Sequence, residues 1–173
     1  MRTIFFVLFL ILCPLAAFSD DLNWFALIGK FEVVVENQAV SLVSRYDRKR
    51  NKSQINVYEK DGYTEIRVQT RFRSDRGLPT YSPRVAIVLR VPLDQSPVVV
   101  SRASYIDESG LHMTNALDTG FEVDGFILNQ NAVSFSVEGM LYPFVNNGDG
   151  QVLDNTRTPI QITGTFSGEI PAD

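Results

Sequence analysis

Apolar and polar side chains alternate with a period of two along most of the chain. The clearest segment is Tyr63–Phe72, where Ile66 and Val68 point to one side and Glu65 and Arg67 to the other. Successive side chains of a strand point to opposite faces of a sheet, so this pattern is typical of a strand with one buried face. No segment carries a sustained helical stripe of apolar residues. The pattern therefore predicts an all-β protein.

A two-residue turn joins this segment to the strand predicted before it. Asp61 and Gly62 both tolerate a positive φ, which favours the tightest type of hairpin. Such a turn fixes which residues face each other across the two strands. The expected pairs are Ile55 with Val68 and Val57 with Ile66 on the inner face, and Asn56 with Arg67 and Tyr58 with Glu65 on the outer face.

Further strands follow the same alternation along the rest of the chain. They are expected at Lys30–Glu36, Ala39–Tyr46, Arg84–Val91, Pro97–Tyr105, Phe121–Leu128, Ala132–Gly139 and Pro159–Ile170. In Phe121–Leu128 the phase changes at Asp124-Gly125, which indicates a bulge or a very tight hairpin. About nine short strands separated by turns predict a single antiparallel β-sandwich or partly closed β-barrel. Irregular stretches are expected at Asp47–Ser53, Ser74–Pro83, Asp107–Gly120 and Asn146–Thr158.

Three glycines occupy inward positions of the last predicted strands. Gly139, Gly164 and Gly168 alternate with polar residues, where apolar side chains would be expected. Glycine there indicates a close approach of a backbone or a bulky ring, or a bend in the sheet. The same glycines could instead leave room for an apolar ligand inside a barrel.

The first 19 residues are typical of a secretory signal peptide. Arg2 gives the positive start, Ile4–Leu12 is an apolar core too short to span a bilayer, and cleavage is expected before Asp20. Cys13 raises the alternative of a lipoprotein, although it lies upstream of the small-residue cleavage signal. We expect a single all-β domain over residues 20–173.

The composition supports an exported, folded domain. The chain is 45% hydrophobic and 21% charged, which excludes a disordered chain, and its single cysteine excludes a disulfide scaffold. No later stretch approaches the roughly 20 apolar residues that a membrane-spanning helix needs. We therefore expect a soluble, secreted product, periplasmic if the source is bacterial, because eukaryotic secreted domains commonly carry disulfides.

Candidate catalytic chemistry is sparse. His112 is the one histidine, no Gly-x-Ser-x-Gly motif is present, and a zinc site would need more His or Cys ligands. His112 is expected to be an ordinary loop residue. A carboxylate-pair hydrolase stays as a minor alternative. The acids available for it are Asp107, Glu108, Glu122, Asp124 and Glu138. We expect a protein that is not an enzyme and needs no cofactor.

One loop has the oxygen-rich composition of a hard-cation site. Asn147, Asp149 and Asp154 could offer ligands to Ca²⁺, but the spacing does not match an EF-hand. A plain Asn/Gly/Asp turn cluster explains the same residues. No metal site is therefore assigned, and these residues stay a weak calcium candidate.

Basic and acidic side chains are segregated along the chain. Residues 45–90 carry 12 basic and 5 acidic side chains, whereas residues 91–173 carry 2 and 11. Most of the basic ones are arginine, which captures phosphate or carboxylate with two parallel hydrogen bonds. The expected anion- or partner-binding surface consists of Arg48, Lys49, Arg50, Lys52, Arg71, Arg73 and Arg76. The alternative is that the acidic half folds against this surface and neutralises it.

The hairpin register sharpens this expectation. Extended outward, it would place Lys52 opposite Arg71 and Arg50 opposite Arg73. Like charges opposed across a sheet are destabilising, so something must offset them or the pairing must end before them.

Trp24, near the start of the exported chain, is expected to plug the core together with Phe25, the alternative being that both residues dock into a partner's groove.

The leading expectation for function is a non-catalytic binding or accessory protein of the cell envelope or extracellular space. Its partner would be an anionic lipid, an acidic polysaccharide or an acidic protein. Nucleic acid is disfavoured by the compartment and the acidic total. A β-barrel carrier of an apolar small molecule or lipid is the main alternative.

Overall fold

Antiparallel strands make up almost all of the described chain. The computed structural model describes residues 24–73, 79–115, 120–146, 148 and 151–171. Its strands are β1 (Phe25–Val35), β2 (Gln38–Asp47), β3 (Lys52–Ser53), β4 (Ile55–Lys60), β5 (Tyr63–Arg73), β6 (Pro79–Pro92), β7 (Val99–Ile106), β8 (His112–Thr114), β9 (Glu122–Leu128), β10 (Ala132–Asn146), β11 (Gln151–Leu153) and β12 (Ile160–Glu169). The predicted signal peptide, Arg76, Asn147 and Asp149 lie outside the described residues.

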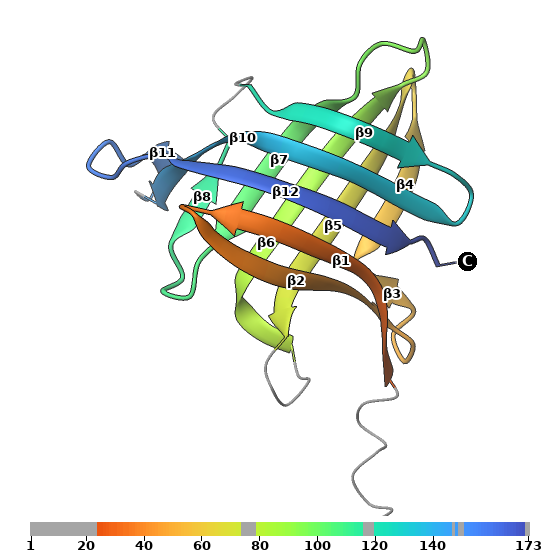
Figure 1. Ribbon diagram of the computed structural model, residues 1–173, viewed down its shortest axis with the longest axis horizontal. Coiled ribbons are helices and arrows are strands. Elements are labelled where there is room, and N and C mark those ends of the chain that lie inside the picture. The colour runs from red at the N-terminus through yellow and green to blue at the C-terminus, as the bar shows by residue number, and fades with distance from the viewer. Residues whose placement is uncertain (1–23, 74–78, 116–119, 147, 149–150, 172–173) are drawn as a thin grey trace, which may run out of the picture.

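The strands form two layers that cross each other (Figure 1). One layer runs β2-β1-β12-β10-β9 and the other β4-β5-β6-β7-β8. Two corners join them, where Leu42 and Val43 of β2 pair with the end of β5, and Tyr142 and Pro143 of β10 pair with β8. These corners close a partial ring, which confirms the predicted sandwich or partly closed barrel. Among the described residues, no helix has the length and apolar character to cross a membrane.

The β4–β5 hairpin has the predicted register. Ile55 faces Val68 and Val57 faces Ile66, as the Asp61-Gly62 turn requires. The pairing ends at Ile55, before Lys52 and Arg50, which is the second of the two expected outcomes. Lys52 instead pairs with Asp47 of β2, and Arg71 pairs with Val43 and Arg84. The segment before Ile55 pairs with β2 and not with β5, so Lys52 and Arg71 do not face each other.

Three short strands lie in stretches that were expected to be irregular. They are β3, β8 and β11, each of only two or three residues. β6 and β10 also extend beyond their predicted bounds. The extension of β10 allows it to pair with β9 along its first half and with β8 farther on. The phase change in β9 is a bulge, at which Gly125 has a φ of 58°.

Aromatic rings fill the space beside the inward glycines. A Cβ on Gly164 would lie 2.6 Å from the Phe31 ring, and one on Gly139 would lie 2.6 Å from the Phe121 ring. A Cβ on Gly168 would meet Ile55 at 2.6 Å. These glycines therefore accommodate core side chains, and the room expected there for an apolar ligand is occupied.

The aromatic residues at the start of β1 do not enter the core. Trp24 is 43% exposed and Phe25 is 39% exposed. The expected core plug is therefore wrong. The chain enters the sheet beside Asp47, beyond the layer of buried side chains.

Candidate functional site: an arginine-lined groove

Period-two alternation brings arginines from three strands onto one outer face. In β6, Val85, Ile87 and Leu89 are buried. Arg84 and Arg90 stand at the two ends of this run and point to the opposite, outer face. The same alternation turns Arg67 and Arg71 of β5 and Arg102 of β7 outward. Antiparallel pairing then sets these side chains in rows across the layer.

The rows define a groove of about 700 Å³ with a short, uncharged floor. Gln69, Ala86 and Ser104 are aligned across β5, β6 and β7 and form the central row. These three side chains are uncharged and shorter than arginine, so the arginines of the neighbouring rows extend farther from the sheet.

Arginines line both banks of this floor. On one bank, Arg71 faces Arg84, and Ile106 and His112 continue the row. On the other, Arg67 and Arg102 flank Val88. Arg67 and Arg71 are four residues apart on β5, so the strand rise separates their Cα atoms by about 13 Å. Among the described residues that line the groove, Glu65 is the one carboxylate against five arginines.

No family model, curated protein or solved structure matches this chain. The groove is therefore interpreted from its own geometry.

Contacts on the sheet surface position two of the guanidinium groups. Arg67 donates to Glu65 Oε1 from Nε at 2.7 Å, while its guanidinium lies 5.0 Å from the Tyr58 ring centroid. Glu65 is only 8% exposed, and its Oε1 also lies 2.7 Å from Arg67 Nη2. Arg90 lies 5.2 Å from the ring centroid of Tyr63. These contacts hold planar guanidinium groups against the layer, which reduces the entropy lost on binding an anion.

The electrostatic effect of the arginines extends to their titratable neighbours. Burial, followed by the positive charges of Arg102 and Arg84, lowers the pKa of His112. On β2, burial followed by the charges of Arg73 and Arg71 lowers the pKa of Arg45. In both groups burial is the larger cause, and the positive charge of nearby arginines adds to it. His112 is thus a strand residue bordering the groove, and its expected place in an ordinary loop is wrong.

The described residues of the predicted basic surface are divided among three places. Arg71 lines the groove, and Arg73 lies at the end of β5. Arg48, Lys49, Arg50 and Lys52 lie at the β2–β3 turn instead, and none of them lines the groove. The groove residues that the sequence interpretation omitted are Arg67, Arg84, Arg90, Arg102 and His112. Outward alternation in Arg84–Val91 was the available signal for two of them.

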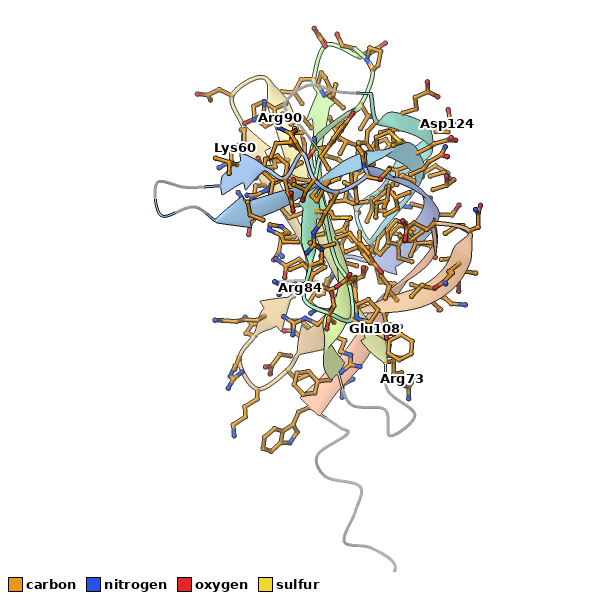
Figure 2. All side chains as sticks on the ribbon, turned by 90° about the vertical axis from the view of Figure 1, so that its left-hand side faces the viewer. Lys60, Arg73, Arg84, Arg90, Glu108 and Asp124 are labelled. Carbon is orange, nitrogen blue, oxygen red and sulfur yellow. The ribbon has the colours of Figure 1, made fainter. Side chains whose placement is uncertain are left out.

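Described acidic residues of the C-terminal half lie on both layers, since Asp94, Asp107 and Glu108 follow β6 and β7 of the arginine-bearing layer. Glu122, Asp124 and Glu138 are exposed on β9 and β10. Figure 2 shows Arg90 toward the left of the view and Asp124 toward the right. The strand of the acidic half that pairs with β6 contributes Arg102, so it adds to the positive charge of the groove.

The described residues of the calcium candidate and of the carboxylate candidates lie as follows. Asp154 accepts hydrogen bonds from the Thr156 amide and hydroxyl at 3.0 and 2.5 Å, and pairs with Arg157 at 3.2 Å. It thus shapes a turn, and its pKa is lowered chiefly by the Thr156 hydroxyl. Across the described residues, no three His, Cys, Asp or Glu side chains are grouped to hold a metal ion. Register does bring Glu122 opposite Glu138, on an open sheet face.

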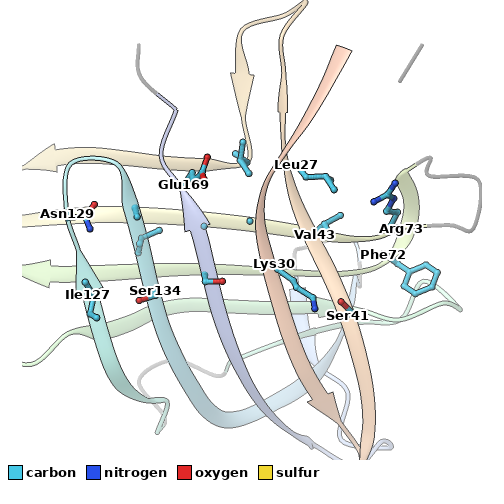
Figure 3. A pocket seen from close by; sticks show the side chains of 16 residues that line it. Leu27, Lys30, Ser41, Val43, Phe72, Arg73, Ile127, Asn129, Ser134 and Glu169 are labelled. Atoms are coloured by element: carbon cyan, nitrogen blue, oxygen red, sulfur yellow. The ribbon is translucent and has the colours of Figure 1, made fainter. Parts of the chain in front are cut away.

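A second groove, of about 840 Å³, crosses the outer face of the other layer (Figure 3). Leu27, Phe72 and Ile127 contribute exposed apolar surface to it. Lys30, Arg73 and Glu169 add charges along its length. Its polar groups do not converge on one point, so it lacks the arrangement that fixes a small ligand.

Proposed function

We propose that the protein is a non-catalytic binding protein of the cell envelope or extracellular space that holds an acidic polysaccharide in the arginine-lined groove. The observation that carries the proposal is the pair of arginine banks on either side of an uncharged floor. An extended chain lying over Gln69, Ala86 and Ser104 could direct carboxylate groups to Arg71 and Arg84 on one side and to Arg67 and Arg102 on the other.

The floor favours a sugar chain among anionic polymers. Gln69 and Ser104 offer amide and hydroxyl groups to sugar hydroxyls, and Ala86 leaves space for a ring above the sheet. Arginine pairs with carboxylate in a bidentate geometry, which suits uronic-acid groups repeated along a chain. Export through the predicted signal peptide would deliver the protein to a compartment where such polymers occur.

The test is the affinity of the protein for oligogalacturonate, a linear chain of carboxylated sugars. Replacing two groove arginines in Arg84→Gln/Arg102→Gln should weaken binding at least tenfold, because each charge-assisted hydrogen bond is worth about 1.5–3 kcal/mol. The matched control is Lys49→Gln/Arg50→Gln, which removes the same charge from the β2–β3 turn and should leave the affinity within twofold. Isothermal titration calorimetry at low and at physiological salt measures both.

Three outcomes would contradict the proposal. Oligogalacturonate could fail to bind, it could bind both double variants equally, or tripolyphosphate could bind more tightly than the sugar chain at equal charge. The last result would show capture of charge alone, with no contribution from the floor.

A further inference from the structure

An exposed patch of aromatic and basic residues lies away from the groove, where β1 enters the sheet. We call it the Trp24 patch. It consists of Trp24, Phe25, Leu27, Arg48, Lys49, Arg50 and Lys52. The four basic residues are all exposed, and Leu27 is 51% exposed, more than either aromatic residue.

Two contacts join the aromatic and basic parts of the patch. The Arg48 amide donates to the Trp24 carbonyl at 2.8 Å, and Lys49 Nζ lies 4.1 Å from the centroid of the Trp24 ring. Asp47, the acid of this turn, pairs with Arg50 at 3.8 Å and accepts a hydrogen bond from its amide. Lys49 thus lies over the indole, and the other three cations lie on the same turn or beside it.

Apolar surface continues from the patch onto the adjoining layer. Leu27 also lines the second groove, where Phe72 and Val43 extend the apolar surface (Figure 3). Arg73 adds a further cation beside Phe72. An exposed edge with aromatic rings, aliphatic side chains and cations is the composition that lies at the boundary between lipid headgroups and acyl chains.

We propose that the Trp24 patch docks the protein on an anionic lipid surface. Trp24 and Phe25 would lie at the headgroup level, with Leu27 beside them, and the four cations would contact lipid phosphates. The proposal does not depend on the polysaccharide site, because the two use different residues. It would orient the domain with the β2–β3 turn toward the membrane.

Intrinsic fluorescence tests the docking directly, because Trp24 is the one tryptophan of the chain. The protein is purified from the cells that export it, its N-terminus is established by mass spectrometry, and it is mixed with vesicles of phosphatidylglycerol or of phosphatidylcholine. We expect a blue shift and co-sedimentation with phosphatidylglycerol vesicles, both weakened by added salt. Phosphatidylcholine vesicles should produce neither effect.

Matched variants locate the contact. Lys49→Gln/Arg50→Gln should bind phosphatidylglycerol vesicles about thirtyfold more weakly, since each basic residue near an anionic surface is worth about a factor of five. Arg84→Gln/Arg102→Gln removes the same charge from the groove and should bind within twofold of the unaltered protein. The variants share one N-terminus, so any contribution from residues before Trp24 cancels in the comparison.

The proposal is overturned if adding phosphatidylglycerol vesicles to the unaltered protein does not change the fluorescence of Trp24. It is also overturned if the groove variant loses vesicle binding while the patch variant keeps it. Either result leaves the polysaccharide site standing, because oligogalacturonate affinity is measured without lipid. Loss of sugar binding with vesicle binding intact would separate the two proposals in the opposite direction.

Discussion

Individual side chains around the groove differ in how they are held. Arg67 is fixed between Glu65 and Tyr58, so part of its charge is already compensated within the sheet. After burial, the positive charge of Arg102 is the next cause that lowers the pKa of His112. We therefore expect Arg102 to contribute more to anion affinity than Arg67 does.

The pKa of His112 should rise when an anion binds. Burial and the two arginines lower this pKa in the free protein, and a bound carboxylate would offset the arginine charges. His112 is the one histidine of the chain, so a titration followed by nuclear magnetic resonance of its imidazole is unambiguous. An unchanged pKa at saturating oligogalacturonate would place the ligand elsewhere.

The same lowered pKa sets the sign of a stability effect. The unfolded chain binds the His112 proton more readily than the folded one, so this group makes stability fall as the pH drops below about 6.5. Arg102→Gln removes one of the opposing charges and should reduce that loss. Urea unfolding at pH 7.5 and pH 5.5 measures the difference, and an equal loss in both proteins would contradict the assigned cause.

The glycines beside the core rings should tolerate no side chain. In Gly164→Ala the new Cβ would lie 2.6 Å from the Phe31 ring and 2.9 Å from the Glu32 carbonyl oxygen. Overpacking of this kind costs about 1–3 kcal/mol of unfolding free energy. The control, Ser167→Ala, changes an exposed position on the same strand and should stay within about 0.5 kcal/mol. Equal urea midpoints for the two variants would show that the core has room.

Strand pairing explains which parts of the fold could be predicted. The two-residue turn at Asp61-Gly62 fixes the β4–β5 register, so those pairs could be derived on paper. Five residues, 74–78, separate β5 from β6, and the pairing of the two strands shifts between Arg71 and Arg73. The row that places Arg71 beside Arg84 was therefore out of reach of sequence reasoning. β8 is three residues long, too short for alternation to distinguish it from a loop.

One strand pair carries a like-charge opposition that can be relieved. Glu122 of β9 lies directly opposite Glu138 of β10 on an exposed face. Glu122→Lys would convert this pair to an attractive one and should raise the unfolding free energy by about 0.2–1 kcal/mol. Asp124→Lys makes the same charge change opposite Ser136 and should gain less. Thermal unfolding of both variants makes the comparison, and a larger gain for Asp124→Lys would contradict the register argument.

The molecule as a whole gathers arginines on the outer face of one of its two layers. The outer face of β5, β6 and β7 is arginine-rich, whereas the carboxylates of β9 and β10 lie on the other layer. Crossed packing of the layers keeps these faces apart, so a net negative chain still presents a positive groove. The basic residues of the middle segment divide between the groove and the Trp24 patch, so they do not form the single surface that their order in the sequence predicts.

The most direct test of the account is to locate bound oligogalacturonate by amide chemical shifts of the ¹⁵N-labelled protein. The account predicts that the largest chemical-shift changes occur in the floor and banks of the groove, at Ala86, Ser104 and Arg84. The amide chemical shifts of β9 should not change. Shifts concentrated at the β2–β3 turn, or spread evenly over both layers, would contradict the assignment of the groove as the binding site.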